Sequence, residues 1–207
     1  MSFHTNRDIN AFNVVSQFER RLASYSGSKH AVCVDSCTNA LFLSLMYLNI
    51  KGEEVTIPCR TYPSVPNSII HAGGRVIFKD VDWKGIYQLK PFPVIDGAKR
   101  FRANMYEKAT LHCLSFHIKK ILGLGRGGAI LTDDIQAVEW LQKARFDGRS
   151  PIPLSEDTFT SLGWNMYMDP LTASHGLWKM MMIGDNNPDQ TEEPPYPDLS
   201  TFPIYTQ

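Results

Sequence analysis

Short apolar runs alternate with amphipathic segments along most of this chain, and that alternation limits the folds it can adopt. Apolar and β-branched residues predict strands at 31–34, 54–59, 75–79, 92–96, 110–115 and 129–132. Apolar residues at helical spacing predict helices at 11–25, from Ser36 or Thr38 to before Gly52, and at 66–72, 134–145 and 170–183. Interleaved strands and helices indicate an α/β fold with a mostly parallel or mixed sheet flanked by helices. In such folds ligands gather at the carboxyl ends of the strands.

The charge balance argues against a polyanionic partner. The 207 residues hold 21 Lys and Arg against 21 Asp and Glu, so no net charge attracts DNA, RNA or an anionic membrane. We therefore expect no nucleic-acid partner and no membrane partner. No apolar run reaches the roughly 18 residues of a membrane span, and the first residues lack the plan of a secretory signal, so a cytoplasmic location is expected.

The four cysteines give no sign of a metal site. Cys33, Cys37, Cys59 and Cys113 lack CxxC spacing and lie in or beside apolar runs. Buried thiols are therefore expected in preference to disulfides or zinc ligands, and no metal is predicted.

The last stretch of the chain differs in composition from the rest. From Gly184 onward it holds five prolines, five acidic residues and no basic one. Such a segment cannot build a core by itself. We predict one large domain at 1–183 and a proline-rich acidic tail at 184–207, whose apolar residues allow it to lie as an extended arm on the body or on a partner chain.

A glycine-rich string at 123–128 matches the letters of a GxGxxG motif. A dinucleotide-binding fingerprint needs a strand immediately before it and a helix opening from it, whereas here a predicted strand follows. We interpret these glycines as a tight turn in which backbone segments approach closely.

Two features favour an anion site. Between Lys99 and Arg126 there are seven Lys and Arg residues against one acid, Glu107. Residues 36–39 lie between a strand and a buried helix, where free backbone N–H groups and the helix dipole favour a phosphate. Each feature alone also has a plain structural interpretation, as a solvated basic face or as a helix N-cap.

Asp96 and Lys120 add reactive groups to this region. Asp96 ends one predicted strand, and Lys120 closely follows the end of the next. A carboxylate and an amine at neighbouring strand ends, near a phosphate-binding helix start, are the parts that a pyridoxal phosphate site requires. The amine bonds to the aldehyde of the cofactor, and the carboxylate keeps its pyridine nitrogen protonated.

In order along the chain, motifs between Phe12 and Met182 resemble the DegT/StrS family of pyridoxal-phosphate-dependent sugar aminotransferases, within the fold-type I, aspartate aminotransferase-like transferases. Residues 36–41, SCTNAL, resemble its SGTxAL phosphate loop, with Cys37 where glycine is usual. Residues 95–99, IDGAK, stand for EDAAQ, and residues 115–120, SFHIKK, resemble SFHPTK. Further segments that carry the resemblance are 18–19, 25–32, 53–58, 61–62, 73–82, 125–128 and 162–173.

This resemblance implies pyridoxal 5′-phosphate as the cofactor, with Lys120 and Asp96 as the catalytic residues. Lys120 would attach the cofactor and Asp96 would hold its ring nitrogen. The cofactor-binding residues that it implies are Ser36, Cys37, Thr38, Tyr62, Asp96, Lys99, Ser115, His117, Lys120 and Asn165. Lys99 replaces a glutamine that usually contacts the ring hydroxyl. Asn165 matches an asparagine that reaches the phosphate of the other subunit, which implies a homodimer with shared sites.

For two of these residues the sequence leaves a second interpretation open. Tyr62 falls where an aromatic ring stacks on the cofactor, but an isolated aromatic residue is more often part of a core. His117 binds the cofactor in one interpretation, and in the other, which is equally supported, it only packs against the strand end or caps it.

The implied function is transfer of an amino group, from glutamate, to a keto sugar that is linked to a nucleotide. Lys120 stands where related dehydratases have histidine, which favours the aminotransferase branch. Family members are about twice this length, so most of a strand–helix–strand unit before Asp96 and the small C-terminal domain after Met182 are missing. The alternative is a reduced relative without turnover that binds the cofactor or serves as an assembly module.

Overall fold

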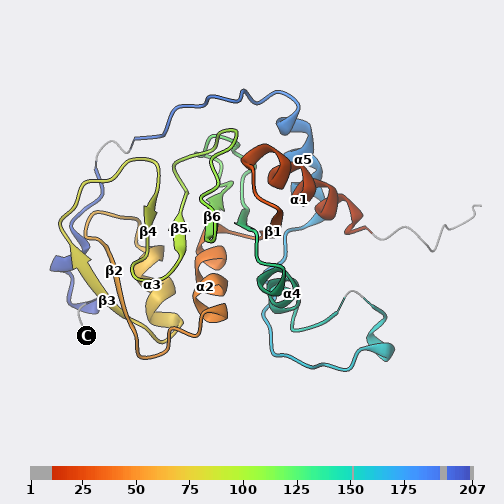
Figure 1. Ribbon diagram of the computed structural model, residues 1–207, viewed down its shortest axis with the longest axis horizontal. Coiled ribbons are helices and arrows are strands. Elements are labelled where there is room, and N and C mark those ends of the chain that lie inside the picture. Colours follow the sequence, from red (N-terminus) through yellow and green to blue (C-terminus); the bar gives the residue numbers. More distant parts are fainter. Residues whose placement is uncertain (1–10, 151, 192–194, 206–207) are drawn as a thin grey trace, which may run out of the picture.

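A five-stranded mixed sheet forms the centre of the molecule (Figure 1). The computed structural model describes residues 11–150, 152–191 and 195–205. In spatial order the strands are β1 (His30–Val34), β7 (Gly128–Thr132), β6 (Leu111–Ser115), β5 (Val94–Asp96) and β4 (Tyr87–Gln88). The expected α/β fold with a mixed sheet is confirmed, and in the described chain only β5 and β6 pair in parallel within this sheet.

Strand direction decides which ends share an edge. β7 is antiparallel to both β1 and β6, so β1 and β6 run in the same direction, and β5 is parallel to β6. The carboxyl ends of β1, β5 and β6 therefore lie at one edge of the sheet, together with the amino end of β7.

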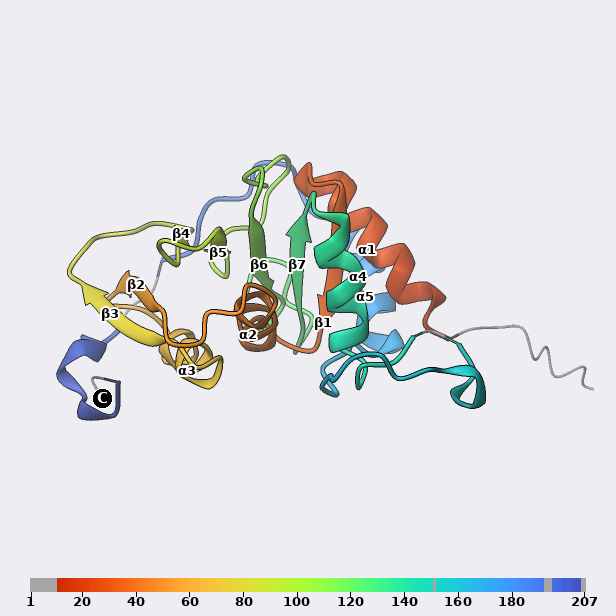
Figure 2. The ribbon, with the colours of Figure 1, turned by 60° about the horizontal axis from the view of Figure 1, so that its bottom comes forward.

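Helices cover both faces of this sheet (Figure 2). Alternate residues of β1 point to opposite faces, so Val32 and Val34 enter one core while Ala31 and Cys33 enter the other. The first core is covered by α2 (Cys37–Tyr47) and α4 (Ile135–Ala144), and the second by α1 (Asn13–Ser26) and α5 (Pro170–Met180). Each helix begins or ends within a few residues of its predicted limits.

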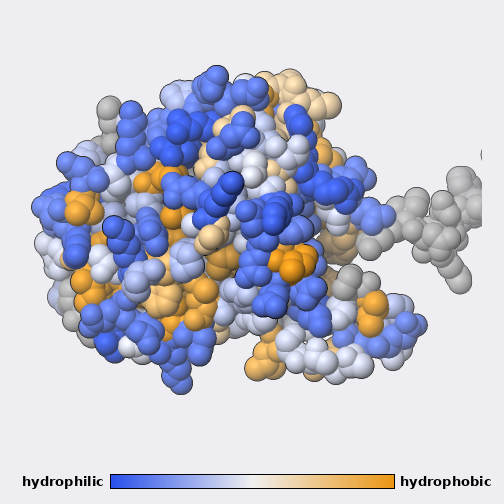
Figure 3. Space-filling model, in the orientation of Figure 1, coloured by the Kyte–Doolittle hydropathy of each residue, from blue (hydrophilic) through white to orange (hydrophobic). Residues whose placement is uncertain are grey.

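A smaller parallel pair, β2 (Glu54–Pro58) and β3 (Arg75–Lys79), lies beside the main sheet with α3 (Ser64–His71) between them in sequence. α2 packs between this unit and the main sheet, in agreement with the buried helix expected after residues 36–39. Phe42 and Met46 are only partly buried there. Figure 3 shows apolar side chains gathered over α2 and α3 on a face that is otherwise largely hydrophilic.

The segment after α5 lies along the body, from α5 past the main sheet to β2 and β3 (Figure 1). We call its described residues, 184–191 and 195–205, the C-terminal arm. The arm holds two short 3-10 helices, η2 (Leu199–Thr201) and η3 (Pro203–Tyr205), and Leu199 is buried against the body. It follows the extended course expected of the tail, while the division into domains at residue 183 stays a prediction.

The differences from the sequence prediction concern short elements. The strand expected at 92–96 is shorter, Val94–Asp96, because Phe92 and Pro93 belong to the preceding turn. β4 and the 3-10 helix η1 (Leu154–Glu156) were not predicted, and neither were the 3-10 helices of the arm. Pro194 and the first residues, on which the signal-sequence argument rests, lie outside the described residues. Within the described residues, no helix has the length and apolar character of a membrane span.

Candidate active site

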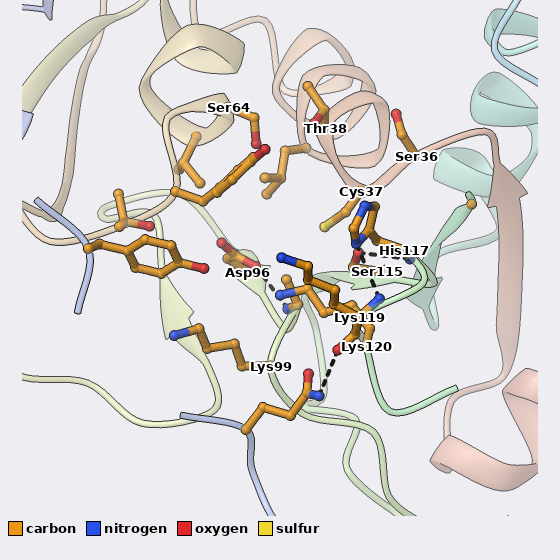
Figure 4. A pocket seen from close by; sticks show the side chains of 18 of the residues that line it. Ser36, Cys37, Thr38, Ser64, Asp96, Lys99, Ser115, His117, Lys119 and Lys120 are labelled. Atoms are coloured by element: carbon orange, nitrogen blue, oxygen red, sulfur yellow. Dashed lines mark hydrogen bonds between the residues drawn. The ribbon is translucent and has the colours of Figure 1, made fainter. Parts of the chain in front are cut away.

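A cavity of about 470 Å³ opens at the sheet edge where β1, β5 and β6 end. Its size is typical of a pocket for a small organic ligand. Figure 4 shows charged side chains from separate segments pointing into it. Nine of the ten residues predicted to bind the cofactor line it: Ser36, Cys37, Thr38, Tyr62, Asp96, Lys99, Ser115, His117 and Lys120.

Asp96 is a buried carboxylate with two defined hydrogen-bond donors. Its Oδ1 accepts from the backbone N–H of Ala98 at 2.9 Å, and its Oδ2 accepts from the Tyr87 hydroxyl at 2.9 Å. Tyr87 in turn takes a hydrogen bond from the Thr61 hydroxyl, because its own proton is used on Asp96. Burial raises the pKa of Asp96, and these hydrogen bonds together with the charges of Lys120 and Lys99 oppose that rise.

Lys120 lies on a tight loop that leaves β6. The loop is closed by backbone hydrogen bonds from Lys120 N to His117 O at 2.8 Å and from Ile118 N to the carbonyl of Gly125 at 3.0 Å. Gly123 has a φ of +53°, and a side chain there would come within 2.9 Å of the Ile118 carbonyl oxygen. The glycine string therefore forms the close turn expected from the sequence, and it holds the Lys120 backbone in place.

The start of α2 gives the cavity an anion-binding end. Ser36 is the N-cap of this helix, and its hydroxyl accepts from Asn39 N at 3.2 Å. Ser36 also forms a parallel bridge with Gly127, just before β7. A side chain on Gly128 would lie 2.6 Å from the Cys37 backbone nitrogen, so only glycine allows this approach. Serine hydroxyls and the helix N-terminus thus face the same space as Lys120.

Cys37, in place of the usual glycine, contributes a half-buried thiol to this end of the cavity. Burial raises its pKa well above the ordinary value, and the charge of Asp96 adds to that effect. The thiol is therefore neutral at physiological pH, and it brings no negative charge next to an anion.

His117 and Ser115 lie at the β6 end of the cavity. The backbone N–H of His117 donates to Ser115 Oγ at 3.4 Å, and His117 Nδ1 accepts from the backbone N–H of Lys119 at 3.3 Å. His117 therefore caps the loop that carries Lys120, next to the end of β6, and its role in binding the cofactor stays a prediction. Its ring also lines the cavity.

Tyr62 is exposed over 57% of its surface, so it is not a core aromatic. It lines the cavity and meets the ring of Tyr196, with ring centroids 6.1 Å apart. On the same side, Lys99 is buried and its ammonium lies over the rings of Trp83 and Tyr196.

Asn165 does not line this cavity. Its side chain is exposed and donates to Asp147 Oδ2 at 3.2 Å, on the loop after α4. That position is consistent with a role towards another subunit, and the role stays a prediction.

Sequence reasoning missed several residues of the cavity wall. Trp83 lies in the segment before β4, where the sequence shows no periodic pattern, and Gln190 and Tyr196 belong to the C-terminal arm. The apolar content of the tail was the one available signal, since it indicated that the tail lies on the body.

The groups in the cavity fit pyridoxal 5′-phosphate. An aldehyde needs an amine, and Lys120 supplies it; a pyridine nitrogen needs a buried carboxylate, and Asp96 supplies it. The phosphate needs backbone N–H groups and hydroxyls, which α2, Ser36 and Ser115 present around the close approach at Gly128.

Curated relatives support this assignment. The chain is 48% identical to the spore coat polysaccharide biosynthesis protein SpsC of Bacillus subtilis, over 83% of this chain and 57% of that protein. It is 23% identical to the UDP-4-amino-4,6-dideoxy-N-acetyl-beta-L-altrosamine transaminase of Campylobacter jejuni, over 86% of this chain and 59% of the relative. The chain therefore spans less than two thirds of the length of these relatives.

A solved structure shares the fold. A DegT DnrJ EryC1 StrS aminotransferase from Brucella abortus superimposes with a TM-score of 0.70 at 22% identity, covering 82% of this chain and 58% of that one.

The family profile described as the DegT/DnrJ/EryC1/StrS aminotransferase family matches residues 4–92 and 102–193. Asp96 and Lys99 fall in the short interval between the two matched stretches, so their placement rests on the geometry of the cavity. Proteins of this family use pyridoxal phosphate to transfer amino groups. This chain belongs to the DegT/DnrJ/EryC1/StrS aminotransferase family.

Proposed function

We propose that the protein is a pyridoxal-phosphate-dependent aminotransferase that moves an amino group from glutamate to a keto sugar carried on a nucleotide. The observation that carries this proposal is the convergence of Lys120 and the buried Asp96 in one cavity that ends at the α2 N-terminus. The Campylobacter relative is named for a reaction on a nucleotide-linked sugar, which supports the same class of acceptor. Glutamate as donor rests on the family resemblance.

Each residue has a distinct part in the proposed reaction. When bound, the cofactor supplies an aldehyde that takes up the amino group and a ring that accepts electrons. Asp96 holds a proton on the ring nitrogen. Lys120 Nζ takes a proton from the carbon of the amino donor and, in the second half of the reaction, gives a proton to the carbon of the acceptor. Ser36 and Ser115 bind the phosphate, together with Thr38 and the α2 N-terminus.

Two further roles complete the proposal. Tyr62, half-exposed at the cavity mouth, covers the cofactor ring and limits the access of water. Asn165, exposed and away from the cavity, completes the site of a second subunit in a homodimer. A cytoplasmic location stays a prediction from the sequence.

The competing function is a relative that binds the cofactor, or only assembles with a partner, and has no turnover. It is motivated by the coverage of the match, which leaves about two fifths of the length of each of these relatives unmatched. A site without a second wall leaves reactive groups open to water.

A cofactor-attachment experiment tests the proposed site. Purified protein is mixed with pyridoxal phosphate, reduced with borohydride and digested, and the modified peptide is located by mass spectrometry. We expect a visible absorbance band before reduction and the label on Lys120. Lys120→Ala should lose both, whereas Lys119→Ala, which removes the neighbouring amine of the same cavity, should keep both.

The outcome separates the two functions. Added glutamate should convert the visible band of an aminotransferase to a shorter-wavelength species, and a passive binder should keep its band. A protein that takes up no cofactor, or that carries the label equally on Lys119, would contradict the proposed site.

A further inference from the structure

The ammonium of Lys99 lies between two aromatic rings. Its Nζ is 4.9 Å from the ring centroid of Trp83 and 4.4 Å from that of Tyr196, and Lys99 is only 6% exposed. The negative faces of aromatic rings attract a cation, and the attraction is stronger where water is excluded. The two rings therefore hold a buried positive charge at a defined place.

Trp83 is a fixed wall of this aromatic cage. Its indole Nε1 donates to the Arg60 carbonyl at 2.9 Å, and its ring packs edge-to-face on Tyr87 with centroids 4.7 Å apart. Tyr87 is the residue whose hydroxyl donates to Asp96. The cage is therefore continuous with the hydrogen bonds that hold the carboxylate.

Lys99 is directed to the active-site side of the cage. It follows Asp96 by three residues, it lines the cavity, and its charge stabilises the Asp96 carboxylate. Figure 4 shows Lys99 reaching into the pocket from the side opposite to α2, while Lys119 and Lys120 approach from the β6 loop. The cavity therefore has a second centre of positive charge, remote from the phosphate-binding end.

Tyr196 comes from the C-terminal arm, and the arm is held at this place by contacts that precede it. Arg100 and Asp189 form two hydrogen bonds, of 2.8 and 2.7 Å, with little exposure of either side chain. The backbone N–H of Gln190 donates to the Lys99 carbonyl at 2.9 Å, and its side chain donates to the Lys119 carbonyl at 2.9 Å. The arm thus connects the segment of Lys99 to the loop of Lys120.

The arm is also attached beyond Tyr196. The backbone N–H of Leu199 donates to the Cys59 carbonyl at the end of β2, at 2.9 Å, and Leu199 is 3% exposed. Hydrogen bonds therefore fix the arm on both sides of Tyr196, at Gln190 and at Leu199. They hold the Tyr196 ring over the cavity, next to the Lys99 ammonium.

We propose that Tyr196 is a positioning residue of the active site, which acts through Lys99: together with Trp83 it holds the Lys99 ammonium where it binds an anionic oxygen of the bound cofactor. The second half of this proposal rests on the proposed function, and the first half concerns only this chain. The C-terminal arm is then a wall of the active site.

A first experiment needs no cofactor. Lysine side chains of the cofactor-free protein are acetylated under limiting reagent, and the rate at Lys99 is measured by mass spectrometry. We expect Tyr196→Leu to speed the labelling of Lys99 about threefold to thirtyfold, in line with the loss of one cation–π contact. Tyr196→Phe keeps the ring and should label at the wild-type rate. An equal rate for Tyr196→Leu and wild type would overturn the positioning role.

A second experiment measures the dissociation constant of pyridoxal phosphate by absorbance titration. We expect weaker binding of about tenfold in Lys99→Met and a similar loss in Tyr196→Leu, with Tyr196→Phe unchanged. In a Lys99→Met background, Tyr196→Leu should add less than twofold, because the ring acts through the ammonium. Independent, additive losses would overturn the action through Lys99.

The two experiments distinguish a failure of the proposed function from a failure of this inference. If the wild-type protein takes up no pyridoxal phosphate, the proposed function fails, and with it the role of Lys99 towards the cofactor. The labelling rates then still decide whether Tyr196 positions Lys99. If the cofactor binds with equal affinity in all variants, the proposed function stands and this inference is refuted.

Discussion

Replacing Asp189 with asparagine is expected to loosen the C-terminal arm while leaving the sheet intact. Asp189 receives two hydrogen bonds from the Arg100 guanidinium, and the two side chains are 6% and 17% exposed. An exposed ion pair contributes about 0–1 kcal/mol, and breaking a buried one costs about 3–5 kcal/mol. Asparagine keeps one acceptor oxygen but no charge, so we expect a loss of about 2 kcal/mol in the free energy that holds the arm closed.

Hydrogen exchange measures this loss where it occurs. The Gln190 amide is bonded to the Lys99 carbonyl, and it exchanges when the arm opens. A loss of about 2 kcal/mol corresponds to about thirtyfold faster exchange, since each 1.4 kcal/mol is tenfold. Glu54→Gln is the control, because it removes a carboxylate from a pair with Arg75 in which both side chains are more than half exposed. It should leave the Gln190 amide unchanged.

If Asp189→Asn changes the exchange of the Gln190 amide by less than about threefold, the pair does not hold the arm. If the amides of β7 speed up equally, the loss is global and the arm is not a separately opening unit.

The pH dependence gives an independent check of the same pair. The Arg100 guanidinium holds the pKa of Asp189 below its usual value, and the charges of Arg102 and Lys84 act in the same direction. A carboxyl group with a lowered pKa in the folded state stabilises above its unfolded pKa of about 3.9, and it loses that effect as pH falls through the lower folded value. In the wild type, the protection of the Gln190 amide from hydrogen exchange should therefore decrease when the pH is lowered below about 4. In Asp189→Asn it should decrease much less.

Three further changes follow from buried polar groups. Glu19→Ala leaves the buried Arg145 guanidinium without its carboxylate and should lower the free energy of unfolding by about 3–5 kcal/mol, measured by urea denaturation. Burial lowers the pKa of His112 to about 4, so stability should fall progressively as pH drops from about 6.5 to 4, and His112→Gln should flatten that part of the profile. Tyr87→Phe removes a hydrogen bond that lowers the pKa of Asp96, so the pH below which pyridoxal phosphate affinity declines should rise, measured by absorbance titration.

Local sequence signals predict the parts of the site, because each part is determined by neighbours in the chain. Ser36 caps α2 through an acceptor three residues before the donor, and Asp96 ends an apolar run. The glycine string turns where its residues need positive φ. These features need no knowledge of the rest of the fold.

Contacts between distant segments could not be predicted in the same way. Asp189 pairs with Arg100 and Tyr196 covers Lys99, but nothing in the sequence tells these partners from the other acidic and aromatic residues of the tail. β4 has two residues, too few for an alternating pattern, and it exists because β5 offers an open edge. Tertiary pairing determines such elements, so they appear only in the structure.

The mixed sheet brings the residues of the candidate site to one edge. β1, β5 and β6 run in one direction, so their ends bring Ser36, Asp96 and Ser115 to a single edge. The antiparallel β7 lies between β1 and β6 and therefore starts at that edge, where Gly128 lets its backbone come close to the start of α2. In an all-parallel sheet, the carboxyl end of β7 would lie at this edge instead of its amino end. Both cores of the described chain support this edge, so the floor of the site rests on the sheet and the helices packed against it, and the C-terminal arm adds a wall to it.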